Sequence, residues 1–300
     1  MSTLEHQLRT RFDRRLRANE PLAAMTSFRI GGPADLLVIV ENDEELSFAL
    51  AAAHRAVVGA FCLGAGTNLL VSDRGVRGLV VRLGDGFRHV DIDALHVTAG
   101  GAVDFGHLVE TVVERGLAGL EFGEGIPGTV GGGLVMNAGA FGGEMAKVVT
   151  RVHGVAGDGE RRALSPQDVK FSYRRTDLPR GFVITRVDFE LRVGDRTMLD
   201  ERMMDLRSKR AARQPRDIPN AGSVFKNPPG DFAGKLLEGA GLKGMRHGGA
   251  QFSEQHANFI VNLGGACADD VRTLMDMARR TVAAHSGVWL EPEVRLVGDW

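Results

Sequence analysis

The sequence has few cysteines, no long apolar run and no excess of either charge. Its 300 residues include two cysteines, Cys62 and Cys267, which excludes a disulfide framework and a multi-cysteine metal site and is typical of a reducing compartment. No run of about 18 apolar residues occurs, so we expect no transmembrane helix. The 37 basic and 38 acidic side chains leave a net charge of −1, which gives no electrostatic reason to bind nucleic acid or a membrane surface. We therefore expect a cytoplasmic protein with a small-molecule partner, no nucleic acid, no membrane and no metal.

Glycine, in contrast, is abundant. It supplies 40 of the 300 residues, about twice the average usage, and is concentrated in runs such as 64–66, 123–133 and 139–143. Such loops let the backbone approach a ligand closely. Because 300 residues exceed the usual size of one domain, we expect at least two cores with room for a cofactor.

Short strands alternate with helices along the chain, which predicts an α+β fold. At the N-terminus, residues 1–20 predict an amphipathic helix with Leu4, Leu8, Phe12 and Leu16 on one face and a solvated face that carries arginines. Further helices are expected from the caps Asn42 and Asp104, over 199–213 and from Asp269. Strands are expected over 36–40, 57–63, 79–83, 89–92, 95–98, 148–155, 182–191, 258–261 and 290–297. The proline-bearing connection 214–220 predicts the start of a smaller second domain.

Two glycine-rich loops are candidates for binding a diphosphate. The first, 64–69, follows an apolar strand, but Leu69 stands where a dinucleotide fingerprint needs its third glycine. A plain tight turn remains the alternative. In the second loop, 124–140, Pro127 is expected in the first turn of a short helix whose N–H groups at Gly128 and Thr129 are free for an anion. The alternative for this loop is a glycine-rich helix packed closely on a sheet.

Three further motifs follow these loops in the sequence: Ser172-Tyr173-Arg174, Ala221-Gly222-Ser223-Val224-Phe225-Lys226-Asn227-Pro228 and Leu290-Glu291-Pro292-Glu293-Val294-Arg295. Together they resemble the UDP-N-acetylenolpyruvoylglucosamine reductase family from about Ser27 to Gly298. The resemblance implies a fold of the vanillyl-alcohol-oxidase type, in which two α+β subdomains hold FAD and a smaller α+β domain binds substrate. It implies an FAD-binding domain over 21–213, with subdomains of about 21–84 and 85–213, and a substrate domain over 214–300.

The resemblance also assigns the cofactors. FAD is expected to be non-covalent, since neither loop holds a histidine, and NADPH is the expected co-substrate. The expected FAD-binding residues are Gly64, Ala65, Gly66, Thr67, Asn68, Leu69, Gly125, Ile126, Pro127, Gly128, Thr129, Gly132, Asn137 and Ala138.

The implied reaction is the reduction of an enolpyruvyl ether to a lactyl ether, in peptidoglycan precursor synthesis. It requires a cation for the carboxylate, a group that stabilises the enol form and a proton donor. The resemblance gives the stabilising roles to Arg174 and Glu293 and the acid role to Ser223. Glu291 is the rival carboxylate, and period-two alternation places it on the same strand face as Glu293.

The nucleotide-sugar substrate is expected to contact Tyr173, Lys226, Asn227, His256 and Asn258. The single tyrosine indicates a short form that lacks the tyrosine-bearing loop of longer relatives. We expect a monomer or weak oligomer. Two alternatives stay open: a flavin-dependent alcohol oxidase of the same fold, which has no need of Ser223, Lys226 and Arg174, and a non-catalytic nucleotide-binding module.

Overall fold

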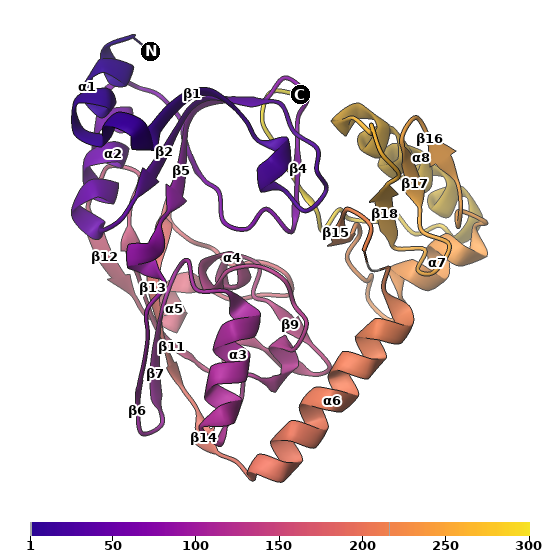
Figure 1. Ribbon diagram of the computed structural model, residues 1–300. Helices are drawn as coiled ribbons and strands as arrows, with labels where there is room; N and C mark the ends of the chain where they lie inside the picture. The colour runs from indigo at the N-terminus through magenta and orange to yellow at the C-terminus, as the bar shows by residue number, and fades with distance from the viewer. Residues whose placement is uncertain (1, 216) are drawn as a thin grey trace. The chain divides into compact units, whose positions relative to one another are not determined.

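The computed structural model describes residues 2–215 and 217–300. The chain forms two units, and each is built from three separate segments (Figure 1). Unit 1 comprises Met1–Asn19, Asp35–Ala65 and Gly78–Ser208, and unit 2 comprises Glu20–Ala34, Gly66–Arg77 and Lys209–Trp300. The expected boundary near residue 214 lies close to the point after Ser208 where the chain passes from unit 1 to unit 2. Two earlier segments, Glu20–Ala34 and Gly66–Arg77, also belong to unit 2.

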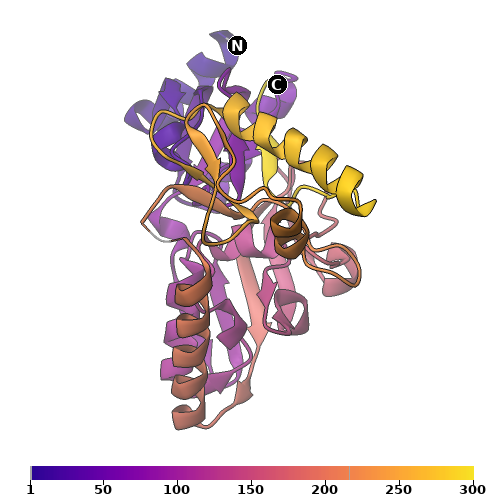
Figure 2. The same cartoon turned by 90° about the vertical axis from the view of Figure 1, so that its right-hand side faces the viewer.

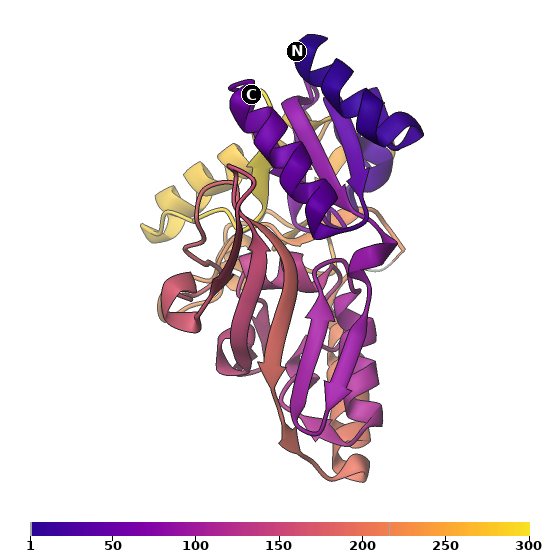
Figure 3. The same ribbon diagram turned by 90° about the vertical axis from the view of Figure 1, so that its left-hand side faces the viewer.

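Two sheets form the framework of unit 1. The first has the strand order β1 (Leu16–Pro21), β2 (Pro33–Val40), β5 (Val76–Leu83) and β3 (Ala60–Cys62), with the ends of β1, β2 and β5 crossing into unit 2. The second has the order β12 (Arg161–Leu164), β11 (Val149–Val155), β13 (Val183–Glu190), β7 (His96–Gly100) and β6 (Val90–Asp93). All pairs in this second sheet are antiparallel, and Figure 3 shows the long β11 and β13 beside the β6–β7 hairpin. Two short ribbons pair β9 (Gly139–Ala140) with β10 (Gly143–Glu144) and β8 (Leu117–Ala118) with β14 (Arg192–Val193).

The helices of unit 1 cover these sheets. They are α1 (Ser2–Phe12), α2 (Asp43–Arg55), α3 (Phe105–Glu114), α4 (Val130–Val135), α5 (Pro166–Val169) and α6 (Arg196–Arg213), whose last turn enters unit 2. Short 3₁₀ turns are η1 (Asp13–Arg15), η2 (Ala23–Met25), η3 (Asp85–Phe87), η4 (Glu121–Gly123) and η5 (Met145–Lys147). The expected caps are confirmed: Asn42 accepts from the Glu45 amide at the start of α2, and Asp104 accepts from the His107 amide at the start of α3.

Unit 2 places helices on one antiparallel sheet. Its strand order is β15 (Asn220–Ser223), β18 (Phe259–Asn262), β17 (Ala250–Phe252) and β16 (Arg246–His247). The helices are α7 (Ala233–Gly239) and α8 (Ala268–Ser286); α8, in yellow in Figure 2, packs on β16 and β17. A parallel pair, β4 (Leu69–Val71) with β19 (Arg295–Val297), brings the first glycine-rich loop beside the C-terminal motif.

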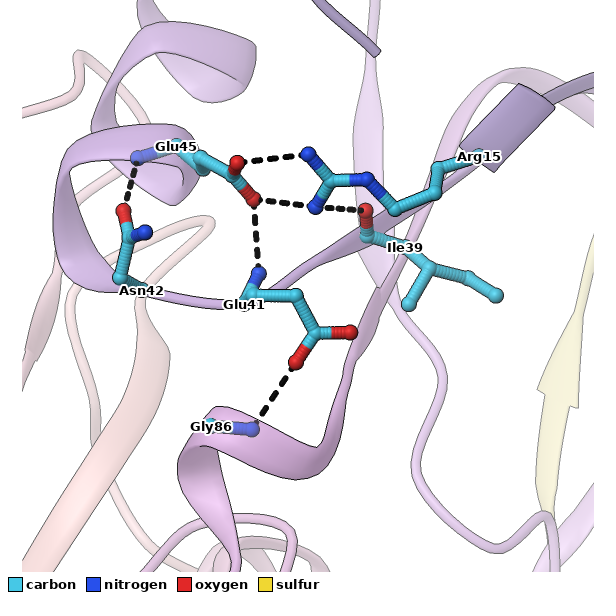
Figure 4. Close-up of polar contacts among 6 residues, drawn as sticks. All are labelled: Arg15, Ile39, Glu41, Asn42, Glu45 and Gly86. Carbon is cyan, nitrogen blue, oxygen red and sulfur yellow. Dashed lines mark hydrogen bonds and ion pairs between the residues drawn. The ribbon is translucent and has the colours of Figure 1, made fainter. Parts of the chain in front are cut away.

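The N-terminal helix is shorter than expected. Leu4, Leu8 and Phe12 are almost fully buried, as the helical spacing predicts, but the helix ends at Phe12 and Leu16 begins β1. Arg15 is not part of a solvated helix face: its guanidinium binds both carboxylate oxygens of Glu45 at 2.6 Å (Figure 4). The same carboxylate accepts the amide of Glu41 at 2.8 Å, so one ion pair ties the N-terminal segment to the start of α2.

The C-terminal strand is also shorter than expected. It covers residues 295–297 rather than 290–297, so the predicted bounds are wrong and Glu291 and Glu293 lie before the strand, on either side of Pro292. Among the described residues, no helix is long and apolar enough to cross a bilayer, and no group of three His, Cys, Asp or Glu side chains is arranged to hold a metal ion.

Candidate active site

A cleft of about 320 Å³ opens in unit 1 between the end of β3, the start of α4 and the strand β13. Four of the expected FAD-binding residues line it: Gly64, Ala65, Thr129 and Gly132. Apolar side chains of Leu63, Leu83, Val135, Phe182, Val183 and Ile184 form much of its wall. An apolar cleft with a few convergent polar groups is the usual form of a cofactor site.

The first loop supplies backbone donors to this cleft. The amides of Gly64 and Ala65 have no hydrogen-bond acceptor within the part of the chain that the structure describes. A Cβ added to Gly64 would lie 3.0 Å from the hydroxyl of Thr129, so the two loops approach each other closely. This arrangement fits the expected role of the first loop in binding an anion.

The second loop differs from the expectation. The helix α4 begins at Val130, not at Pro127, and Thr129 caps it by accepting from the Gly132 amide. The other first-turn amides are also used, because Val130 donates to the Val103 carbonyl at 2.9 Å and Gly131 donates to the Gly101 carbonyl at 3.0 Å. The prediction that Pro127 lies in the first turn is therefore wrong, but the amides of Gly128 and Thr129, which were expected to be free, have no acceptor among the described residues.

The other expected FAD residues lie outside the lining of the cleft. Gly125, Ile126, Pro127 and Gly128 form the approach to α4, while Asn137 and Ala138 are buried after it. Gly66, Thr67, Asn68 and Leu69 belong to unit 2, since the division between the units falls after Ala65. Gly66 has φ +67°, and an added Cβ there would lie 2.3 Å from the Met25 carbonyl oxygen, so only glycine fits.

Asn137 holds the turn that carries Arg174. Its side-chain amide donates to the Ser172 carbonyl at 3.1 Å and to Glu144 at 3.2 Å, and its oxygen accepts the Ala146 amide at 3.0 Å. With 1% of its surface exposed, this side chain is committed to the fold.

The turn itself is tight. Ser172 and Arg175 exchange backbone hydrogen bonds of 2.9 and 3.2 Å, which leaves Tyr173 and Arg174 at its tip. Arg174 adopts φ +56°, a region that a non-glycine residue enters only when its surroundings impose it. Its guanidinium lies 5.2 Å from the ring of the half-exposed Tyr173.

The structure brings Ser223 and Glu293 onto adjoining segments of unit 2. The Glu293 amide donates to the Val224 carbonyl at 2.8 Å, and the Lys226 amide donates to the Glu291 carbonyl at 2.9 Å. Between these bonds, Phe225 and Pro292 form an antiparallel bridge. The serine motif and the C-terminal motif thus form one short ladder, although 65 positions separate Lys226 from Glu291 in the sequence.

Across this ladder, the side chains of Lys226 and Glu291 form an ion pair of 2.5 Å. Lys226 is 17% exposed and Glu291 is 71% exposed. Glu291 therefore contacts the lysine of the serine motif, a role that the alternation argument missed. Asn68 of the first loop joins the same ladder, because its amide side chain donates to the Glu293 carbonyl at 3.1 Å.

The remaining substrate candidates lie around β18. Asn258 is buried and its side chain binds the backbone of Phe225 twice, donating at 2.8 Å and accepting at 3.0 Å. His256 accepts the Asn258 amide through Nδ1 at 3.2 Å, and burial lowers the pKa of its ring below the ordinary value. Asn227 is exposed and accepts the amide of Ala233 at 3.0 Å. Asn258 is thus a scaffold for the serine motif.

Arg82 and Arg88 also line the cleft, although neither belongs to a motif recognised in the sequence. A signal for Arg82 was present: it directly follows the fully buried run Leu79, Val80 and Val81 at the end of β5. An arginine that directly follows buried strand residues needs solvent or a polar partner for its guanidinium group.

Comparison with known proteins agrees with this arrangement. Residues 34–165 match the FAD binding domain family, and residues 214–297 match the UDP-N-acetylenolpyruvoylglucosamine reductase, C-terminal domain family. The two matches lie on either side of the connection that contains α6.

Relatives that match nearly the whole chain are also named UDP-N-acetylenolpyruvoylglucosamine reductase. UDP-N-acetylenolpyruvoylglucosamine reductase 2 of Symbiobacterium thermophilum is 50% identical over 99% of this chain and 98% of its own length. The reductase of Heliobacterium modesticaldum is 44% identical over 93% of this chain and 90% of its own. The crystal structure of the reductase from Thermus caldophilus superposes with a TM-score of 0.82 at 36% identity, over 94% of this chain and 98% of that one.

A more distant structure shows the fold alone: 4-ethylphenol oxidase from Gulosibacter chungangensis has a TM-score of 0.50 at 16% identity, over 64% of this chain and 42% of its own. The expected α+β class with an FAD-binding fold of the vanillyl-alcohol-oxidase type is thereby confirmed. With half of its residues identical to those of one such enzyme over nearly the whole length, the chain belongs to the UDP-N-acetylenolpyruvoylglucosamine reductase family.

Proposed function

We propose that the chain reduces the enolpyruvyl ether of UDP-N-acetylglucosamine to the lactyl ether, UDP-N-acetylmuramate, for peptidoglycan precursor synthesis. It is an FAD-dependent oxidoreductase that uses NADPH. The observation that carries the residue assignment is the ladder between residues 224–226 and 291–293, since it holds Ser223 and Glu293 on adjoining segments.

The cleft of unit 1 fits FAD by the chemistry of its donors. The unpaired amides of Gly64 and Ala65 suit a phosphate oxygen, and a Cβ added to Gly132 would meet only the Thr129 hydroxyl, at 3.3 Å. No histidine is present in either loop, so the cofactor is held without a covalent bond. Gly66 to Leu69, Gly125 to Gly128, Asn137 and Ala138 complete the proposed set, with Asn137 acting through its backbone because its side chain is already used.

When bound, FAD would supply a hydride, drawn from NADPH, for the terminal carbon of the enolpyruvyl group. Negative charge then develops on the carboxylate side of the substrate. Arg174 binds that carboxylate by charge-assisted hydrogen bonds, and Glu293 in its protonated form donates to the developing enolate oxygen. Ser223 delivers its hydroxyl proton to the adjacent carbon, which completes the addition of one hydride and one proton.

The substrate's nucleotide sugar is assigned to residues 214–300 together with Tyr173. Lys226 carries a positive charge for the diphosphate, while Asn227 and His256 offer hydrogen bonds. Because the Nδ1 atom of His256 already accepts a backbone amide, the neutral ring presents its proton on Nε2. Asn258 supports this surface by fixing Phe225.

Anaerobic rapid mixing tests the proposal. NADPH should bleach the flavin absorbance, and the enolpyruvyl substrate should restore it with formation of the lactyl ether. An alcohol oxidase of this fold would instead be reduced by an alcohol and reoxidised by oxygen, and a binding module would do neither. We further propose a cytoplasmic monomer or weak oligomer that binds neither nucleic acid nor membrane.

A further inference from the structure

Arg82 is a half-buried cation in the wall of the cleft of unit 1. It is the penultimate residue of β5 and directly follows a buried apolar run. Among residues 2–215 and 217–300, its guanidinium has no hydrogen bond and no ion pair. Burying a charge without a partner is unfavourable, so this side chain lacks a compensating group within the protein.

Two neighbouring charges of the same sign act on Arg82. Burial lowers the pKa of Arg82, and the positive charges of Arg88 and Arg17 lower it further, while the smallest effect, that of Cys62, raises it. Arg88 also lines the cleft. Like charges near a half-buried cation repel it, and an anion bound beside that cation reverses the sign of the interaction.

The first-turn amides of α4 do not supply this compensation, because they already bind Val103, Gly101 and Thr129. FAD carries its negative charge on one group, the diphosphate. Resting on the proposed function, we propose that Arg82, with Arg88 beside it, binds the diphosphate of FAD and that this contact sets the affinity for the cofactor.

The two arginines contribute unequally. Arg88 has 62% of its side chain exposed and lies 3.3 Å from the Asp85 carboxylate, so solvent and a counter-ion already screen its charge. Arg82 is more deeply buried and has no counter-ion in the part of the chain that the structure describes. Its planar guanidinium matches two phosphate oxygens at once, which an ammonium group does not. Arg82 is therefore the residue whose loss should matter most.

The test uses Arg82→Met, Arg82→Lys and Arg88→Met, with Arg192→Met as a control that removes an exposed arginine of β14. Flavin is removed from each purified enzyme, and the dissociation constant of added FAD is measured by flavin fluorescence over a series of salt concentrations. Losing a hydrogen bond to a charged group should raise this constant for Arg82→Met by about 10- to 100-fold. The salt dependence should also become shallower, a change that a merely structural role would not produce.

Arg82→Lys should lie between wild type and Arg82→Met, Arg88→Met should change the constant only a few-fold, and Arg192→Met should not change it. Inorganic pyrophosphate should raise the unfolding temperature of wild-type apoprotein but not that of Arg82→Met. Without ligand, Arg82→Met should unfold at or above the wild-type temperature, because like-charge repulsion is relieved.

Wild-type FAD affinity in Arg82→Met, or a loss of affinity with an unchanged salt slope, would overturn the assignment. A wild-type chain that binds no FAD would instead overturn the proposed function. In that case, the pyrophosphate measurement still decides whether Arg82 is an anion site.

Discussion

The side chain of Asn137 donates to the Ser172 carbonyl at 3.1 Å and thereby fixes the turn that carries Arg174. The two residues come from motifs 35 positions apart, one from a glycine-rich loop and one from the turn with the sole tyrosine. A residue expected to bind the cofactor thus positions a residue proposed to bind the substrate.

Asn137→Ala should lower the free energy of unfolding by about 1–3 kcal/mol, because the buried Asn137 side chain loses its hydrogen bonds to the Ser172 carbonyl and the Ala146 amide. The loosened turn should also raise KM for the enolpyruvyl substrate, which urea unfolding and steady-state kinetics will measure. Thr176→Val is the matched control, since it removes a hydrogen bond of 2.9 Å from the same segment to the Val135 carbonyl. A control variant with the same rise in KM would argue against a specific role for Asn137.

Ser223→Ala should separate the two half-reactions. Reduction of the flavin by NADPH needs no acid near the enolpyruvyl group and should stay near the wild-type rate. Reoxidation by substrate should slow by about 10²–10⁴-fold, the usual effect of losing a positioned general acid. Stopped-flow flavin absorbance resolves the steps. Reoxidation at the wild-type rate would remove Ser223 as the proton donor and make Glu293 the candidate.

Glu291→Gln should free Lys226 from its ion pair. Glu291 is largely exposed, so we expect a change in stability of less than about 1 kcal/mol. The unpaired ammonium should bind the substrate diphosphate several-fold more tightly at low salt, and this gain should fade as salt is added. Calorimetric titration of the substrate checks both points. Glu238→Gln, which breaks the pair with Lys243 at 3.0 Å, should leave the affinity unchanged; weaker binding in Glu291→Gln would contradict the idea.

The two cysteines should differ in reactivity. Burial raises the pKa of Cys62 to about 12, so at pH 8 only about one thiol in ten thousand is the reactive thiolate. Partial burial and the neighbouring Asp73 and Asp270 also raise the pKa of Cys267, but its side chain is exposed, so it should be alkylated first. Mass spectrometry should find one rapid label in the native wild type and none in Cys267→Ser. Labelling of Cys62 should increase only as the pH approaches 12 or when the protein unfolds.

His256 should make stability depend on pH. Because burial lowers its pKa in the folded chain, the unfolded chain binds a proton at higher pH than the folded one. The stability that neutral His256 contributes to the fold is therefore fully present above a pH of about 6.5, the pKa of histidine in the unfolded chain. This stability is lost as the pH falls below that value toward the lower pKa of the folded chain. His256→Gln should reduce the decline in chemical stability between pH 7 and pH 5. An identical decline in both proteins would show that His256 does not titrate in this range.

Local signals predicted the local structure well. The helix caps at Asn42 and Asp104 and the apolar face of α3 depend on neighbours within a few residues, which the sequence displays directly. The serine and C-terminal motifs were likewise visible as motifs, but the ladder between them depends on distant backbone pairing.

The errors have tertiary causes. Pro127 suits a first turn by its fixed φ, yet α4 begins where the Thr129 hydroxyl and the Val103 and Gly101 carbonyls accept its amides. Residues 291–293 bond to the serine motif instead of continuing a long strand. The Val103 and Gly101 carbonyls and the serine motif lie far in sequence from the residues that they bind, whereas the Thr129 cap is a local signal.

The parallel pairing of β4 with β19 also bears on how the chain folds during synthesis. Residues 66–77 leave the ribosome early, but their partners in unit 2 include residues 295–297, almost the last to be made. The edge of β4 therefore stays unpaired, and open to association with other chains, until the end of translation. Ribosome-bound chains halted shortly before residue 290 should leave Leu70 and Val71 open to protease, although both are fully buried in the finished protein.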